Sequence, residues 1–450
     1  MFRGLGGNPA GLAALAFALL LAPQGQAQAA DLGADCCGDL EARIAELEAT
    51  TARKGNRVVS LQISGTVHES LMFWDDGAES DAYLVTNTGY QSRFNIGGKA
   101  QVSPDVTAGF LITAGVWGSP SLAVDQTNDE SVSSSPSAHP DSFFIRESKV
   151  YLDSKTFGKL TLGQQSVAAD DITSLNVSRS LHIATPAQQI YMGSFQARDG
   201  DALTGFRYNS LMVGDGSNTP GDPTRLDAIR YDSPSIAGFV ASASWGEDDY
   251  WDVALRYSGL VGGQFKVAAG IAYGVLTDRD SSIANTSTLG NNGCLPESAV
   301  GEIDCHQIGM SASAMHLPTG LFAYGAYGVK TDDNAPDGED DDSSFWYIQA
   351  GIEKKWLPYG ATTVFGEFER FDTGFNRVIA GAGIGSFSSA TVEMWGIGIN
   401  QHFESAALDV YVKYNNYSAS ADNLTGNGFT GQDVEFNDFS TIYTGARIMF

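Results

Sequence analysis

The chain has 450 residues, of which 43% are hydrophobic and only 18% charged, and its formal net charge is −27. This acidity excludes a nucleic-acid partner, because the phosphate backbone would be repelled. The one long apolar run, residues 11–22, is too short to cross a bilayer as a helix, which excludes a bundle of membrane helices. The 52 glycines and the 11% of aromatic residues suit many strands joined by turns.

Residues 1–29 have the pattern of a secretory signal peptide. Arg3 precedes the apolar run, and Ala27-Gln28-Ala29 follows it as a small-residue cleavage site. A buried N-terminal helix is the alternative, but these flanks favour export. We therefore predict that the mature chain starts near Ala30 and folds in an oxidising compartment.

Residues 30–57 are predicted to form a linker and one short amphipathic helix. Cys36 and Cys37 precede the helix, and within 38–54 the apolar Leu40, Ile44 and Leu47 recur at helical spacing among charged residues. A helix of this length is not stable alone in water, so it must pack on something. Two partners remain open: equivalent helices in a trimer, forming a short periplasmic coiled coil, or the rest of its own chain.

From residue 58 onward the apolar period changes to two, which is the period of a β-strand. In 59–74, apolar residues such as Ile63 and Val67 occupy odd positions, while polar residues such as Ser64 and Thr66 occupy even ones. Rows of the same kind recur in 265–275, 408–414 and 440–450, and the last row ends in Phe450. An apolar face beside a small or polar face indicates lipid on one side and water on the other.

Sixteen segments are predicted as strands: 58–74, 90–102, 105–117, 142–153, 158–165, 224–233, 236–246, 250–259, 264–277, 304–316, 320–331, 343–356, 361–371, 390–402, 406–418 and 438–450. Short turns such as 103–105 alternate with long polar segments such as 75–89, 117–141, 278–303 and 331–342. An even strand number with this asymmetry is typical of transmembrane barrels. The sequence therefore predicts an all-β fold, a sixteen-stranded antiparallel transmembrane β-barrel over 58–450. A soluble sandwich is the alternative, but it leaves the signal peptide and the terminal Phe450 as coincidences.

Several stretches resemble one known family. Residues 36–57 (CCGDLEARIAELEATTARKGNR) are similar to the N-terminal signature of porins from α-proteobacteria of the rhizobial and Brucella group, and 72–77 (MFWDDG) are similar to the end of the first strand in that family. Residues 157–164 (FGKLTLGQ) resemble the strand that general porins place before their constriction loop. The resemblance implies a homotrimeric diffusion channel in the outer membrane. It also implies contact with membrane lipid and lipopolysaccharide, and insertion by the barrel-assembly machinery through the C-terminal strand.

The resemblance further implies that residues 166–200 fold into the barrel, because the loop at this place narrows the channel in porins. A sixteen-stranded barrel encloses a wide aqueous lumen, so selection by size requires such a loop. The segment carries Asp170 and Asp171 near its start, and Arg179 and Arg198 later. An ordinary solvated loop is the alternative for the acidic pair.

Basic residues of the early strands are expected opposite this loop, as in the family. Arg93 and Lys99 face the lumen if Phe94 faces lipid, and Arg146 matches a basic position of the family. A cation facing lipid near the midplane would cost about 2 to 4 kcal/mol, so a position in the lumen or at the rim is favoured. The predicted constriction set is Asp170, Asp171, Arg179, Arg198, Arg93 and Arg146, and the predicted pore lining adds Lys99, Arg256, Lys413 and Arg447.

Cys294 and Cys305 flank a loop segment of an exported chain, so we expect a disulfide between them. The adjacent Cys36 and Cys37 do not readily pair with each other, and pairing across a trimer would be one use for them.

No residue pattern predicts an enzyme. None of the six histidines lies in a serine, cysteine or metal-site motif, and neither Gly-x-Ser-x-Gly nor His-Glu-x-x-His occurs. We therefore predict passive diffusion of ions and small hydrophilic solutes, with no cofactor and no metal ion. A solute-specific outer-membrane channel and, less favoured, a barrel-borne hydrolase are the alternatives. The surplus of carboxylates predicts a preference for cations, although the most acidic runs, 75–81 and 332–342, lie in outer loops.

Overall fold

The computed structural model describes residues 59–129, 143–213, 219–223, 225–247, 249–282, 294, 300–380 and 383–450. The predicted signal peptide, the helix at 38–54 and the Cys36-Cys37 pair lie outside the described residues. Among the helices of the described part, none is long and apolar enough to cross a membrane.

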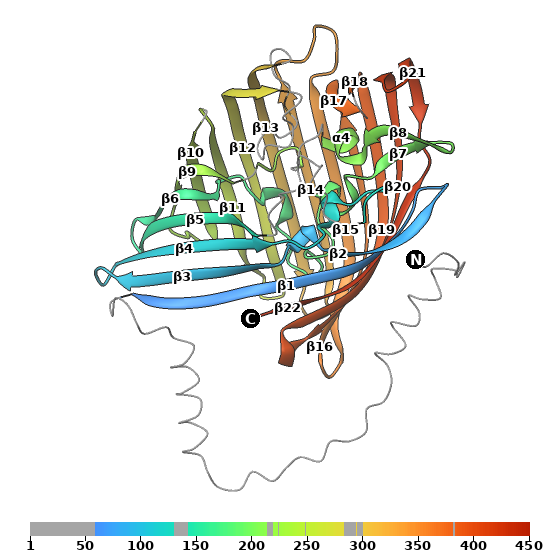
Figure 1. Cartoon of the computed structure of the whole chain (residues 1–450). Coiled ribbons are helices and arrows are strands. Elements are labelled where there is room, and N and C mark those ends of the chain that lie inside the picture. The colour runs from blue at the N-terminus through green and yellow to red at the C-terminus, as the bar shows by residue number, and fades with distance from the viewer. Residues whose placement is uncertain are drawn as a thin grey trace.

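Within the described residues, sixteen strands form one closed antiparallel barrel, which confirms the fold predicted from the sequence. These strands are β1 (Ser60–Asp75), β3 (Arg93–Gln101), β4 (Val106–Val116), β5 (Phe143–Ser154), β6 (Gly158–Ser166), β9 (Arg225–Asp232), β10 (Phe239–Gly246), β11 (Trp251–Val261), β12 (Phe265–Ser282), β13 (Val300–His316), β14 (Leu321–Asp332), β15 (Asp342–Leu357), β16 (Gly360–Thr373), β19 (Ser389–Phe403), β20 (Leu408–Gly426) and β22 (Phe439–Met449). Each strand pairs with the next in this order, and Figure 1 shows them as one continuous curved wall.

The two ends of the barrel segment meet to close the wall. In the pair of β1 with β22, Thr66 lies opposite Met449. Beyond the strands, the Gly65 amide donates to the Phe450 carbonyl (2.8 Å), and the Phe450 amide donates to the Gly65 carbonyl (3.1 Å). The terminal residue is therefore part of the hydrogen-bonded wall.

Successive residues of each strand face opposite sides of the wall. On β1, Ile63 and Val67 are exposed outside, whereas His68 is buried inside. On β22, Ile448 is exposed outside and Tyr443 is buried inside. The exposed apolar side chains thus form an outer face suited to lipid, as the alternation predicts.

The barrel has short turns at one end and long connections at the other, where further elements form. β2 (Ser80–Thr86) folds back on β1, so the prediction of a plain polar loop at 75–89 is wrong. β12 and β13 stay paired as far as Ser282 and Val300, which shortens the loop predicted at 278–303. Polar residues can continue these strands because their backbone N–H and C=O groups form hydrogen bonds with the adjacent strand. The smaller elements are η1 (Thr88–Tyr90), η2 (Ser121–Ala123), β17 (Asn376–Ala380), β18 (Gly383–Phe387), β21 (Phe429–Glu435) and, at a short turn, η5 (Glu404–Ala406).

The chain between β6 and β9 enters the barrel, and we call its described residues, 167–213 and 219–223, the inner loop. It contains η3 (Ile172–Ser174), α3 (Gln189–Met192), the hairpin of β7 (Gln196–Asp199) and β8 (Ala202–Arg207), and α4 (Tyr208–Val213). Its apolar side chains, such as Tyr191, Phe195 and Leu211, join inward residues of strands from β13 through β22 to β1 in one large buried cluster. The inner loop therefore fills one side of the lumen.

Candidate pore constriction

The inner loop is fastened to β11 as soon as it leaves β6. The Arg256 guanidinium donates to the carbonyls of Ala168 (2.6 Å) and Asp170 (2.8 Å). The Ala169 amide donates to the buried carboxylate of Asp252 (2.6 Å). The loop predicted at 166–200 thus turns inward at its first residues, and it continues beyond 200 to β9.

Polar side chains of the later strands then hold the inner loop along the inner wall. Their contacts satisfy loop backbone and side-chain groups that would otherwise be buried without partners. Three of them mark its path: Ser311 on β13 to the Ile172 carbonyl (2.6 Å), Ser180 to Gln349 on β15 (2.7 Å), and Tyr443 on β22 to the Tyr191 carbonyl. The loop therefore follows the wall from β11 round to β22.

A buried polar cluster joins the inner loop to β1. The Tyr411 hydroxyl lies 2.7 Å from His68 Nε2 and 2.6 Å from Ser70 Oγ, and it accepts from the Asn87 amide (3.0 Å). The ring of His182, on the inner loop, lies 5.9 Å from that of His68. Burial lowers the pKa of His182 well below its ordinary value, so this ring is neutral at the contact.

The wall from β3 to β9 is left open by the inner loop, and it carries predicted cations. Arg93 lies 4.7 Å from the centre of the Tyr90 ring. Arg146 donates to the side-chain carbonyl of Gln91. Both guanidinium groups therefore have neutral partners.

Carboxylates gather where the inner loop meets β6 and β9. Asp170 lies 3.6 Å from Arg225, and the Asp171 amide donates to Asp222 (2.7 Å). Burial, together with the charges of Asp171 and Asp170, raises the pKa of Asp222 well above its ordinary value. Arg146 interacts electrostatically with Asp170 and Asp171 and with Arg93. The structure therefore brings together four of the six predicted constriction residues: Arg93, Arg146, Asp170 and Asp171.

A second polar row lies nearer the short-turn end, and the sequence analysis missed most of it. The register places Lys99, Tyr151 and Arg230 in one row across β3 to β9. Alternation alone could have found Arg230, because its neighbours Ile229 and Tyr231 are exposed outside. The missed charged residues of this wall are Glu147, Lys149, Lys159, Arg225, Arg230 and Asp232.

A family model of Gram-negative porins matches residues 11–423. The chain is a Gram-negative porin. Among solved structures, the anion-selective porin from Comamonas acidovorans has 15% identity and a TM-score of 0.53, over 87% of this chain and 100% of that chain. OmpT, an outer membrane protein of Vibrio cholerae, has 13% identity and a TM-score of 0.51, over 89% and 99%. Both share the fold. The comparison with curated proteins finds no match.

Family and fold together place this porin in the outer membrane. They make it a channel for passive diffusion, and they point away from an enzyme.

Two loop cations of the predicted constriction lie elsewhere in the porin. Arg198 is buried and donates to Asp76 (2.9 Å) and Glu79 (3.2 Å), so it ties the inner loop to the first outer connection. Arg179 lies on the inner loop beside Glu353 (3.8 Å). The backbone amide of Arg179 also donates to the Glu353 carboxylate (2.8 Å), so the wall strand β15 fixes the position of Arg179.

The four predicted lining cations differ in their burial and in their partners. Lys413 is buried beside Glu367 (2.7 Å) and 4.8 Å from the ring of Tyr191, so it lies behind the inner loop and does not line the open channel. Arg447 faces inward and pairs with Asp409 (2.8 Å). Arg256 faces inward but anchors loop carbonyls. Lys99 is exposed near the short-turn end of β3. A buried cation needs a carboxylate or carbonyl partner, and the inner loop decides which cations are buried.

The predicted cysteine pair is joined in the structure. Cys294 and Cys305 form a disulfide, with their Cα atoms 6.3 Å apart. Cys305 lies on β13 near the long-connection end, so the bridge ties an outer connection to the wall.

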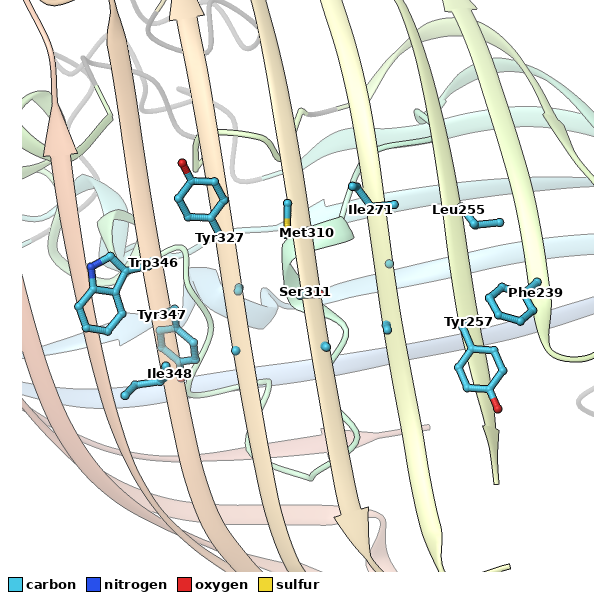
Figure 2. Close-up of a pocket in the computed structure, with 15 residues that line it drawn as sticks. Phe239, Leu255, Tyr257, Ile271, Met310, Ser311, Tyr327, Trp346, Tyr347 and Ile348 are labelled. Carbon is cyan, nitrogen blue, oxygen red and sulfur yellow. The ribbon is translucent and has the colours of Figure 1, made fainter. Parts of the chain in front are cut away.

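The apolar hollow shown in Figure 2 is not the channel of this porin. Exposed side chains of β10 to β15 surround it, among them Leu255, Ile271, Tyr327 and Trp346. These residues belong to the outer, lipid-facing side of the wall. Two neighbouring hollows lie over β12 to β16 and over β9 to β13, and they also have outward apolar rims.

Proposed function

We propose that this porin is a general diffusion channel of the type found in α-proteobacteria of the rhizobial and Brucella group. The observation that carries the proposal is the path of the inner loop, which lies against the wall from β11 to β22 and leaves the charged wall from β3 to β9 open. Ions and small hydrophilic solutes would pass between the two. Such flow down a gradient requires no catalytic residue, no cofactor and no metal.

The working form proposed is a homotrimer that contacts its neighbours through the outer face of β1. Glu69 supports this face, because its carboxylate is exposed on the outside of the wall, where it accepts from Thr86 (3.0 Å) and Ser92 (3.2 Å). A carboxylate that faces lipid is unfavourable, so contact of Glu69 with a neighbouring subunit is favoured over contact with lipid. The rest of the outer face would contact lipid and lipopolysaccharide, and the C-terminal strand would engage the barrel-assembly machinery.

The proposed processing divides the chain into a signal peptide (1–29), a linker and helix (30–57) and the barrel (58–450), with the constriction in the inner loop. N-terminal sequencing of the purified porin tests the first boundary. A mature chain beginning near Ala30 is expected.

Channel recordings test the proposal. The purified porin in a planar bilayer should insert in groups of three equal conductance steps, with a linear current and no saturation by sugars. In a Cys36→Ser, Cys37→Ser background, Arg179→Cys labelled with a bulky thiol reagent should lower the conductance, because the label extends from the inner loop. The same label at Lys155→Cys, in a short turn, should leave it unchanged. Silent bilayers with correctly folded trimers would contradict the channel, and a saturable current would favour a solute-specific one.

A further inference from the structure

We propose that the constriction selects anions, and that its preferred solutes are small oxyanions, such as phosphate and short carboxylates, that fit a guanidinium group. This inference rests on the proposed channel function. It is opposite in sign to the cation preference that the net charge of −27 suggests. Selectivity depends on the charges that a solute meets in the channel rather than on the total charge of the chain.

The inner loop supplies almost no negative charge where it follows the wall. Residues 172–197 (ITSLNVSRSLHIATPAQQIYMGSFQA) contain no Asp and no Glu, and Arg179 is their one charged residue. The opposed acidic row that the family resemblance implies is therefore missing over this stretch. The loop presents neutral or positive groups to the open wall.

Two carboxylates of the open wall are engaged by neighbouring cations. Glu147 lies 2.6 Å from Lys149, and Asp232 lies 2.8 Å from Arg230. Asp409, beside the wall on β20, is paired with Arg447 (2.8 Å). Each of these pairs is close to neutral, so none of them creates a cation-attracting surface.

Four guanidinium groups and three carboxylates make up the constriction cluster: Arg93, Arg146, Arg225 and Arg256, with Asp170, Asp171 and Asp222. Asp170 is opposite Arg225, and Asp222 accepts bonds from the Asp171 amide and the Thr173 hydroxyl. Arg256 is occupied by loop carbonyls. The carboxylates gather at one side, at the start and end of the inner loop.

Among the described residues of the cluster, the cations Arg93 and Arg146 are outside any ion pair, as are the carboxylates Asp171 and Asp222. Among the described residues, neither arginine has a carboxylate within salt-bridge distance; the contacts of the two arginines are the Tyr90 ring and the Gln91 amide. They stand on β3 and β5 with β4 between them, and the Phe144 ring and the Gln91 amide occupy the space over Gly115 of β4. Strands are about 4.8 Å apart, so the backbones that carry the two arginines lie roughly 10 Å apart.

The planar guanidinium fork matches two oxygens of a phosphate or a carboxylate, which a halide cannot offer. The partners of both guanidinium groups are neutral, so an anion can approach them without breaking an ion pair. Weak binding here would raise the local anion concentration without trapping the solute, as conduction requires.

Reversal potentials in a KCl gradient across a planar bilayer test the inference. The native porin should be more permeable to chloride than to potassium. Arg93→Gln and Arg146→Gln should each lower the chloride-to-potassium permeability ratio several-fold, and the double variant should bring it near or below one. Lys155→Gln is the matched control, because Lys155 bonds to the Pro104 carbonyl in a short turn away from the constriction. It should leave the ratio unchanged.

Inorganic phosphate tests the preferred solute. Added phosphate should reduce the chloride current of the native porin and have a much smaller effect on the double variant, whose folding is checked by its heat-dependent migration as a trimer. Normal conductance with a cation preference would overturn the inference and leave the channel function intact. A native chloride current that phosphate does not reduce would overturn the oxyanion preference. Complete absence of current would instead count against the proposed channel.

Discussion

At the scale of single residues, the partner of a cation decides its role in this porin. Lys413 and Arg198 are buried against carboxylates, and they hold parts of the fold together. Arg93 and Arg146 lie beside neutral groups, and the anion selectivity proposed above assigns their charge to passing solutes. A sequence shows which side of a strand carries a cation, but this difference in partners depends on the inner loop.

The titration of Asp222 makes a prediction at the same scale. Its pKa is raised by burial and by the nearby Asp171 and Asp170, so it binds a proton at a pH above the ordinary aspartate range of about 4. As pH falls, the constriction loses this negative charge, and the anion preference should therefore increase. Reversal potentials measured from neutral to acidic pH check the trend.

Asp222→Asn is the control for this titration. It should raise the anion preference at neutral pH and remove the corresponding step on acidification. The raised pKa of Asp222 also makes the stability of the folded loop depend on pH. Its protonation stabilises the folded loop below the ordinary aspartate pKa, and this contribution is lost as pH rises through the raised pKa. An unchanged step in Asp222→Asn would assign the titration to another group.

At the scale of elements, the inner loop is a long segment held by a few strong anchors. Its middle is fixed by hydroxyl and amide groups of the wall, and its β7–β8 hairpin by Arg198. Arg198 donates to Asp76 and Glu79 of the first outer connection, and to the carbonyl of Asp201 (2.6 Å). This residue therefore joins two connections that are far apart in the sequence.

Arg198→Met should destabilise this junction strongly. The change removes one partner of a buried ion pair and leaves Asp76, which is only 2% exposed, with an uncompensated charge. Such a loss costs about 3 to 5 kcal/mol in the free energy of unfolding. Urea unfolding of the refolded porin in detergent, followed by tryptophan fluorescence, measures the change.

Lys355→Met provides the comparison, because Lys355 and Glu404 form an exposed ion pair at the short-turn end. Water screens such a pair, so its loss should leave the unfolding midpoint where it is. Equal midpoints for Arg198→Met and the native porin would show that the hairpin is held by other contacts.

At the scale of the whole molecule, stability depends on closing the wall between β1 and β22. A barrel has no free edge only when its first and last strands pair, and here the terminal Phe450 adds two backbone bonds to Gly65. The ring of Phe450 also occupies the space over Gly65, where a Cβ atom would lie 2.5 Å from it. Glycine at this position therefore allows the terminal ring to lie on the wall.

Phe450→Ala should reduce the amount of assembled porin in the outer membrane several-fold, because the ring packs at the closing seam and the C-terminal strand is proposed to guide insertion. Phe157→Ala is a suitable comparison, since Phe157 is a similarly exposed aromatic residue, 75% exposed against 64% for Phe450, in a turn away from the seam. Heat-modifiable trimer in membrane fractions is the measurement. Equal amounts of assembled trimer for the two variants would show that the Phe450 ring has no specific role in assembly.

The sequence by itself determined the wall of this porin. Period-two alternation gave sixteen strands and the inward faces of Arg93 and Arg447, because lipid on one side and water on the other penalise any other arrangement. Only the tertiary structure decided which cations meet the channel. The inner loop is positioned by contacts with strands distant in sequence, such as Ser311, Gln349 and Tyr443. As a result Lys413 is buried and Arg256 is engaged, whereas Arg146 has Gln91 as its partner. Local alternation does not predict such long-range contacts. Alternation indicates which side of a strand a residue faces, whereas its burial depends on the segment that packs over it.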